Sequence, residues 1–146
     1  MTPLSIAVLT VSDTRTEETD KSGAVLIECL QAAGHKLHSK TIVKDDIYQL
    51  RAEVSAHIFN PEVHVLLLTG GTGFTVRDNT FEAIKPLFDV DIEGFGELFR
   101  QLSYEEIGTS TIQSRAFAGL ANASIISEQL DSSHQPCNFT DKLKRQ

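Results

Sequence analysis

One stretch decides how the chain is interpreted: Leu66-Leu67-Leu68-Thr69-Gly70-Gly71-Thr72-Gly73-Phe74-Thr75-Val76-Arg77-Asp78. Its apolar first residues, which follow Val63 and Val65, are typical of a strand that is buried on both faces. The glycines tolerate positive φ and let another molecule approach the main chain closely. A helical pattern begins near Thr80. Because the turn and the start of this helix aim backbone N–H groups at one place, the stretch predicts an anion-binding site with the Asp78 carboxylate at its edge.

Two simpler interpretations of this stretch compete with an anion site. A glycine-rich turn after a strand is often only a tight corner, and Asp78 or Asn79 is a suitable N-cap for the helix that follows. The stretch is not a P-loop, because no Gly-Lys-Ser/Thr follows it, and it lacks the G-x-G-x-x-G spacing of dinucleotide-binding turns. Taken alone, it leaves the phosphate site and the tight corner as equal alternatives.

Strands and helices alternate along the rest of the chain. Apolar runs at 4–11 and 35–43 predict strands, and helical spacing predicts helices at 20–33, 45–60, 80–88 and 94–102. Gly34 ends the first helix, and Pro86 is expected to shorten or kink the third. Residues 109–120 are interpreted as a closely packed helix. This order predicts a single α/β domain over residues 1–146, with a mostly parallel sheet between helical layers.

Three polar segments follow predicted strands: Ser12-Asp13-Thr14, Lys44-Asp45-Asp46, and the glycine-rich turn with Asp78. The carboxyl ends of parallel strands meet at one edge of a sheet, where such sheets bind ligands. We therefore expect the three segments to lie close together. Ser12 and Asp13 are equally plausible as ligand contacts and as turn formers.

The composition limits the classes of partner. The 20 acidic residues outnumber the 13 basic ones, for a net charge of −7, which disfavours a nucleic-acid partner. The chain does not begin with a charged region followed by a long apolar stretch, and no segment reaches about 18 apolar residues. A cytoplasmic location without membrane contact is therefore expected. The five histidines lack the paired spacing of a zinc site.

Several motifs together resemble the MoaB/MogA family of molybdenum-cofactor biosynthesis proteins. The Leu-Leu-Leu-Thr-Gly-Gly-Thr-Gly-x-x-x-Arg-Asp pattern at 66–78 resembles the first signature of that family. The other matching motifs are Val8-Leu9-Thr10-Val11-Ser12-Asp13, Asp20-Lys21-Ser22-Gly23, Ala33-Gly34-His35, Glu93-Gly94-Phe95-Gly96-Glu97-Leu98-Phe99-Arg100 and Gly108-Thr109-Ser110-Thr111-Ile112-Gln113-Ser114-Arg115-Ala116. Pro136-Cys137-Asn138-Phe139 resembles the MoaB branch in particular. The similarity covers nearly the whole chain and is far more specific than the glycine-rich turn alone.

The resemblance implies a molybdopterin-binding-like fold, a three-layer α/β/α sandwich around a mostly parallel sheet. It also implies a reaction, because MogA-type members transfer an adenylyl group from ATP to molybdopterin with Mg²⁺ and release pyrophosphate. Asp78 matches the signature aspartate and is the first candidate for the catalytic, metal-linked carboxylate. Asp45 occupies the place of the second such aspartate, but Asp46 is adjacent, and a plain N-cap role is an equal alternative.

The resemblance further implies contacts with the ligand. Main-chain amides of the glycine-rich turn should bind a phosphate or the pterin edge; its residues are Gly70, Gly71, Thr72 and Gly73. Hydroxyls and a cation suited to an anionic pterin come from Thr109, Ser110, Ser114 and Arg115. For these four residues, a solvated helix face is an equal alternative.

Three functions agree with these residues. The first is a molybdopterin adenylyltransferase that works with Mg-ATP. The second is a non-catalytic protein of the MoaB type that binds molybdopterin or a precursor. The third is an α/β assembly or scaffold subunit with a vestigial site. The resemblance also implies a homotrimer or homohexamer and contacts with other molybdenum-cofactor biosynthesis proteins.

The sequence departs from this family after Asn122. There the family continues with an apolar strand, a turn containing Pro-Gly that contacts the ligand, and a helix. Here the segment 125–130 resembles the end of that helix, so one strand and most of one helix are expected to be absent. Loss of an interior strand would cost more free energy than the few kcal/mol by which a folded domain is stable. We therefore expect that the sequence as given omits residues near 123–126, and we consider a true deletion the less favoured alternative. A true deletion would put activity in doubt.

Overall fold

The computed structural model describes residues 2–70, 79–107 and 116–129. The strands within these ranges are β1 (Ser5–Val11), β2 (Lys36–Val43), β3 (Val65–Gly70), β4 (Val90–Asp91), β5 (Ala116–Ala121) and β6 (Ser124–Gln129). The helices are α1 (Lys21–Ala32), α2 (Ile47–Phe59), α3 (Asn79–Ile84), the short 3-10 helix η1 (Lys85–Leu87) and α4 (Gly94–Ile107). None of these helices is long and apolar enough to cross a membrane.

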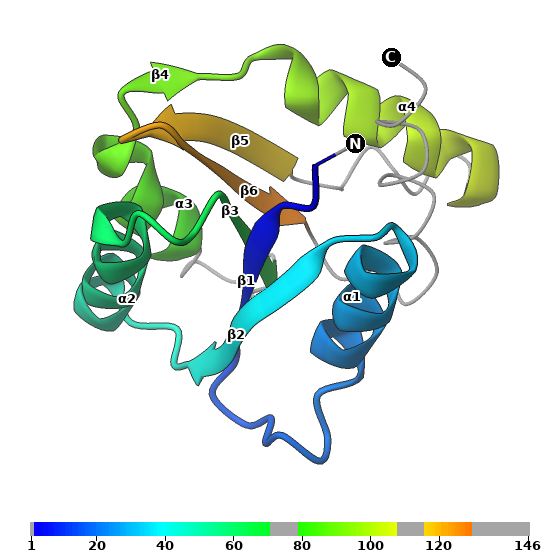
Figure 1. The fold of residues 1–146 in the computed structure, drawn as a ribbon, viewed down its shortest axis with the longest axis horizontal. Helices are drawn as coiled ribbons and strands as arrows, with labels where there is room; N and C mark the ends of the chain where they lie inside the picture. The colour runs from blue at the N-terminus through cyan, green and yellow to red at the C-terminus, as the bar shows by residue number, and fades with distance from the viewer. Residues whose placement is uncertain (1, 71–78, 108–115, 130–146) are drawn as a thin grey trace.

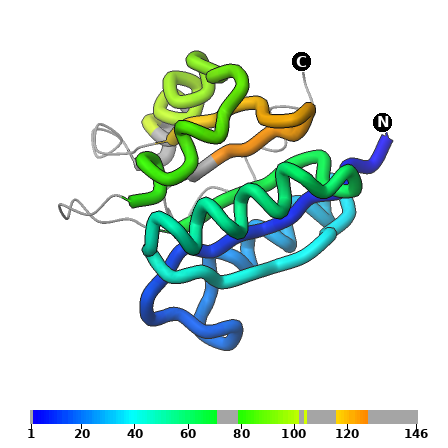
Figure 2. The backbone as a smooth tube through the Cα atoms, turned by 90° about the vertical axis from the view of Figure 1, so that its left-hand side faces the viewer, coloured from blue at the N-terminus to red at the C-terminus, as the bar shows by residue number. Residues whose placement is uncertain are grey.

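All six strands belong to one sheet, in the order β2-β1-β3-β6-β5-β4 (Figure 1). β2, β1, β3 and β6 run parallel, whereas β5 runs antiparallel to both β6 and β4. Helix α1 packs on one face of the sheet, and α2 and α3 pack on the other. Figure 2, viewed from the side of α2, shows this helix running along β1 in front of the sheet. The predicted α/β sandwich is confirmed, with an antiparallel edge that makes the sheet mixed.

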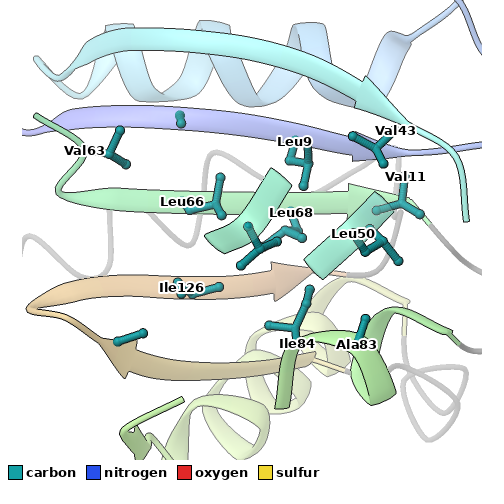
Figure 3. Packing of buried hydrophobic residues seen from close by; sticks show 13 residues of the cluster. Leu9, Val11, Val43, Leu50, Val63, Leu66, Leu68, Ala83, Ile84 and Ile126 are labelled. Atoms are coloured by element: carbon teal, nitrogen blue, oxygen red, sulfur yellow. The ribbon is translucent and has the colours of Figure 1, made fainter. Parts of the chain in front are cut away.

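Two apolar clusters hold the helices on the sheet. Alternate residues of a strand point to opposite faces. Leu9 and Val11 of β1 therefore belong to the cluster under α2 and α3, whereas Ile6 and Val8 belong to the cluster under α1. Figure 3 shows the first of these clusters, in which β1, β2, β3 and β6 meet α2 and α3. Each fully buried leucine contributes roughly 1.5–3 kcal/mol to folding because it is removed from water.

Most predicted element boundaries agree with the structure. Asp20 is the N-cap of α1, and Gly34, with a φ of 88°, follows the C-cap Ala33. Helix α2 ends at Phe59, with Asn60 as its C-cap. α3 ends at Ile84 and gives way to the 3-10 turn that contains Pro86, because proline has no N–H to continue the helix.

The prediction of a helix over residues 109–120 is wrong where the structure tests it. Ala116–Ala121 is strand β5, which pairs with β6 on one side and with β4 on the other. Alanine favours helices, but sheet pairing overrides that weak preference here. Gly119 lets the Phe88 ring lie against the strand, since an added Cβ would be 2.3 Å from that ring. Residues 109–115 of the predicted helix lie outside the described residues.

The interpretation of residues 125–130 as the end of a helix is also wrong. Ser124–Gln129 is strand β6, which lies between β3 and β5, and Ile126 is fully buried there. Asn122 and Ala123 alone connect β5 to β6. The interior of the sheet is therefore continuous from β3 through β6 to β5. No interior strand is missing between β3 and β5 in the described sheet, and the choice between omitted residues and a true deletion near 123–126 stays a prediction.

An ion pair between buried Asp20 and Lys40 holds the segment between β1 and α1 against the sheet. Asp20 accepts hydrogen bonds from the Gly23 amide (3.1 Å) and the Thr10 hydroxyl (2.6 Å). The Lys40 ammonium on β2 lies 3.3 Å from the Asp20 carboxylate and 3.1 Å from that of Glu17. The start of α1 is thereby attached to both β1 and β2.

The charges in this pair shift each other's pKa. Burial alone would raise the pKa of the Asp20 carboxyl, but the hydrogen bonds that it accepts and the Lys40 ammonium outweigh burial and lower it. Burial would likewise lower the pKa of Lys40, but the carboxylates of Glu17 and Asp20 outweigh burial and raise it. Both members of the pair are therefore charged at neutral pH.

Replacement of Ala123 by glycine is expected to stabilise the protein. Asn122 and Ala123 have φ of 47° and 65°, and such a left-handed conformation costs alanine about 1–2 kcal/mol. Glycine offsets part of this gain by making the unfolded chain more flexible, so Ala123→Gly should raise the free energy of unfolding by about 0.5–1 kcal/mol. The control Ala52→Gly, at an exposed position within α2, should lower it by about 1 kcal/mol. Urea unfolding measures both changes, and a loss of stability in both variants would contradict this account of the turn.

The Asp20–Lys40 pair should make the protein less stable in acid. Because folding lowers the pKa of Asp20, its contribution is complete above the unfolded value of 3.8 and is lost as the pH falls through the folded pKa. Asp20→Asn should lower the free energy of unfolding by about 2–4 kcal/mol at neutral pH. The difference from the unsubstituted protein should shrink below about pH 4. Urea unfolding from neutral to acid pH measures this difference, which would stay constant if the carboxylate charge contributed nothing.

Candidate functional site

Three strands end at the same edge of the sheet. Val11 of β1 pairs with Val43 of β2 and with Gly70 of β3, and each of these is the last residue of its strand. The Ser12 amide continues the contact by donating a hydrogen bond to the Val43 carbonyl (2.9 Å). The segments that follow β1 and β2 are thereby adjacent, as the sequence predicted, and the glycine-rich turn starts beside them.

Ser12 shapes the loop that follows β1. Its Oγ accepts hydrogen bonds from the amides of Thr14 (3.2 Å) and Arg15 (3.0 Å). These bonds are typical of a serine that closes a turn on its own main chain. Of the two roles considered for Ser12, the described contacts show the turn former, and a ligand contact stays a prediction.

Asp45 links the neighbouring loops through its main chain. Its amide donates a hydrogen bond to Asp13 Oδ1 (3.1 Å), and its carbonyl accepts one from Asn79 Nδ2 (3.2 Å). Asp13 belongs to the loop after β1, and Asn79 is the first residue of α3. The two hydrogen bonds therefore join the loops after β1 and β2 to the first residue of α3.

The structure separates the roles of the two adjacent aspartates. Asp46 is the N-cap of α2, and its Oδ1 accepts a hydrogen bond from the Gln49 amide (2.9 Å). Asp45 precedes the cap and is half-buried, whereas Asp46 is exposed. The N-cap of α2 is therefore Asp46 and not Asp45, which favours Asp45 over Asp46 as the second candidate carboxylate of the site.

Gly70 is required by the sheet itself. Its φ is 96°, and a Cβ added to it would lie 2.2 Å from the Val11 carbonyl oxygen. A larger residue at this position would push β3 away from β1 at the edge where the loops converge. The glycine therefore has a packing role in addition to the predicted ligand contact.

The other predicted site residues lie outside the described residues. They are Gly71, Thr72, Gly73, Asp78, Thr109, Ser110, Ser114 and Arg115. Their roles stay predictions from the sequence.

Mg²⁺ would fit the described part of the site if water and phosphate oxygens supplied most of its ligands. No group of three or more His, Cys, Asp or Glu side chains that could hold a metal occurs within the described ranges. Mg²⁺ needs no such cage, because it takes one or two protein carboxylates and leaves its other positions to water and phosphate oxygens. Asp45, a half-buried carboxylate at the edge of the sheet, fits that requirement.

Sequence reasoning missed the contact that Asn79 makes. It considered Asn79 only as an N-cap, whereas its side chain donates to the carbonyl of a residue in another loop. No spacing in the sequence indicates this contact, because its partner lies 34 residues away. The Asp20–Lys40 pair likewise has no signature in the sequence, because its two residues come from segments that only the fold brings together.

Comparisons with known proteins agree with this architecture. Residues 7–129 match the family model MoCF_biosynth, described as a probable molybdopterin binding domain. The molybdenum cofactor biosynthesis protein B of Escherichia coli (strain K12) is 50% identical over 161 residues, which cover 98% of this chain and 95% of the relative. Because 98% of this chain is about 143 residues, about 18 of the 161 aligned positions have no counterpart here.

Solved structures give the same result. A crystal structure of a molybdenum cofactor biosynthesis protein B is 42% identical, with a TM-score of 0.87 over 99% of this chain and 98% of that one. The tungsten cofactor synthesizing protein MoaB from Pyrococcus furiosus is 35% identical, with a TM-score of 0.78 over 98% of this chain and 91% of that one. Since family model, sequence and fold agree over nearly the whole chain, it belongs to the MoaB/MogA family of molybdenum-cofactor biosynthesis proteins.

Proposed function

We propose that this chain acts in molybdenum-cofactor biosynthesis by binding molybdopterin and adenylylating it with Mg-ATP. The observation that carries the proposal is the placement of Asp45. Its half-buried carboxylate lies at the edge where β1, β2 and β3 end, and Asp46 takes the capping role in its place. The family supports the ligand, since its common domain is described as a probable molybdopterin binding domain.

The reaction needs two anions to be brought together. A phosphate oxygen of molybdopterin attacks the α-phosphorus of ATP, a new P–O bond forms, and the bond to the bridging oxygen breaks with release of pyrophosphate. Catalysis of this kind depends mainly on positioning and on stabilising the developing negative charge. Bound Mg²⁺ would neutralise charge on the phosphate oxygens. Asp45 and Asp78 would hold the metal, and the amides of Gly70 to Gly73 would bind a phosphate or the pterin edge.

The remaining predicted contacts complete the proposed site. Thr109, Ser110 and Ser114 supply hydroxyls, and Arg115 supplies a cation suited to the anionic pterin. We further propose that the protein works in the cytoplasm as a homotrimer or homohexamer and contacts other proteins of the same pathway. These proposals rest on the resemblance to the family.

A specific observation supports a second candidate function, a MoaB-type protein that binds molybdopterin or a precursor without catalysis. The E. coli relative at 50% identity is named molybdenum cofactor biosynthesis protein B, and about 18 of the 161 aligned positions have no counterpart here. The resemblance implies that the family has a ligand-contacting turn in the segment that follows Asn122. A chain that lacks this turn would retain the sheet-edge loops and yet assemble an incomplete catalytic site.

Asp45→Asn and Asp46→Asn form a matched pair that tests the proposed chemistry. Both remove one negative charge, but asparagine at 46 remains a good N-cap. With molybdopterin, Mg²⁺ and ATP, Asp45→Asn should lower the rate of pyrophosphate release about 100-fold or more, because the metal loses a ligand. Asp46→Asn should stay within about threefold of the unsubstituted protein. Equal losses in the two variants would contradict the role assigned to Asp45.

Pyrophosphate release with and without molybdopterin separates the two functions. An adenylyltransferase releases pyrophosphate only when both substrates are present, and Asp78→Asn should abolish that release. A binding protein retains molybdopterin on a sizing column and releases no pyrophosphate. That second result would overturn the proposed reaction in favour of the binding function.

A further inference from the structure

The main-chain N–H and C=O of Asp45 lie between strand β2 and helix α2 and take part in the hydrogen bonding of neither. Strand β2 ends at Val43, and Asp46 is the N-cap of α2. The Asp46 amide donates a hydrogen bond to the Lys44 carbonyl (2.8 Å), and the Asp46 carbonyl accepts one from the Leu50 amide (2.9 Å). The main-chain N–H and C=O of Asp45 must therefore find partners outside the ladder and the helix. Asp13 and Asn79 provide those partners, one to the amide and one to the carbonyl.

We propose that Asp13 and Asn79 are positioning residues that fix the Asp45 carboxylate at the site instead of contacting the ligand. The inference rests on the proposed function, in which Asp45 is catalytic. Asp13 comes from the loop after β1, and Asn79 comes from the first turn of α3. Asp45 is thereby held between two separate segments of the chain, so its main chain cannot shift without breaking one of the two hydrogen bonds. A displacement of about 1 Å at such a site can lower the rate about 100-fold.

The chemistry of each contact identifies which atom matters. The Asp45 amide needs an acceptor oxygen from residue 13, and both aspartate and asparagine offer one. A negative charge is not required for that bond. The Asp45 carbonyl needs a donor from residue 79, which asparagine supplies and an ionised aspartate of the same size cannot. Asp13→Asn should therefore preserve the contact, whereas Asp13→Ala and Asn79→Asp should each remove one.

A hydrogen bond of the same kind elsewhere in the fold provides a control. Asp89 Oδ2 accepts from the Asn122 amide at 2.8 Å, a contact that spans 33 residues, as against 32 for Asp13 and Asp45. Asp13 and Asp89 are both exposed. Asp89 precedes β4 and its partner lies in the β5–β6 turn, so neither residue belongs to the loops at the site. Asp89→Ala thus removes an equivalent carboxylate–amide bond without touching Asp45.

Amide hydrogen exchange, followed by NMR, tests the contacts without reference to any reaction. Exchange at the Asp45 amide should be about tenfold faster in Asp13→Ala than in the unsubstituted protein, and little changed in Asp13→Asn and Asp89→Ala. The amides of Leu9 and Leu68 in the sheet interior report whether each variant is folded. An Asp45 amide that exchanges at the same rate in Asp13→Ala as in the unsubstituted protein would overturn the proposal.

Pyrophosphate release then tests the consequence for the site. Asp13→Ala and Asn79→Asp should lower kcat about tenfold or more. Asp13→Asn should stay within about threefold, and Asp89→Ala within about twofold. A loss in Asp13→Asn as large as that in Asp13→Ala would overturn the proposal, because the charge and not the acceptor would then be what matters. An unsubstituted protein without turnover would count against the proposed reaction alone, and the exchange rates of the Asp45 amide would still decide whether Asp13 holds it.

Discussion

The close parallel pairing of β1 with both β2 and β3 is the constraint on which the site depends. Val11 is opposite Val43 on one side and Gly70 on the other, so three strands stop at one level. The pairing of Val11 with residue 70 requires a glycine there, because the Cβ of any other residue would clash with the Val11 carbonyl oxygen. The loops that leave these strands are far apart in the sequence, and the common end point is what makes them neighbours. The polar residues of the site are thus positioned first by backbone pairing and only then by their own contacts.

The support beneath the loops differs from one side of β1 to the other. Under the segment that leads into α1 lie charged and polar groups: the buried Asp20 carboxylate contacts the Lys40 ammonium and the Thr10 hydroxyl. Under α2 and α3 it places apolar side chains such as Leu50 and Ile84. The charged side depends on pH and the apolar side does not. Acid that protonates Asp20 would therefore weaken the support on one side of the site and not the apolar support on the other.

Sequence patterns predicted the parts of the fold that local physics determines. The apolar run 66–68, the end of the first helix at Gly34 and the break at Pro86 each have their cause within a few residues, and the structure agrees with them. The helix predictions within residues 116–129 were wrong because pairing with distant strands decides the conformation there. Ala116–Ala121 is a strand because it pairs with β6 and β4, and β6 is a strand because it pairs with β3. The candidate site shows the same division. The convergence of the loops followed from element order, whereas the contact between Asn79 and Asp45 has no signature in the sequence.

The position of β6 has a consequence for how the chain folds. β2, β1 and β3 pair among residues 5–70 and enclose short connections, whereas Leu66 of β3 must find Ile126 of β6 to close the middle of the sheet. Closing so long a loop costs entropy before any contact repays it, and such pairing slows folding. During synthesis, the edge of β3 stays unpaired until nearly all of the described chain has emerged. An exposed parallel edge of this kind can pair with other chains. The two-residue β5–β6 hairpin shortens that interval, because both strands can form locally and add to β3 as one unit.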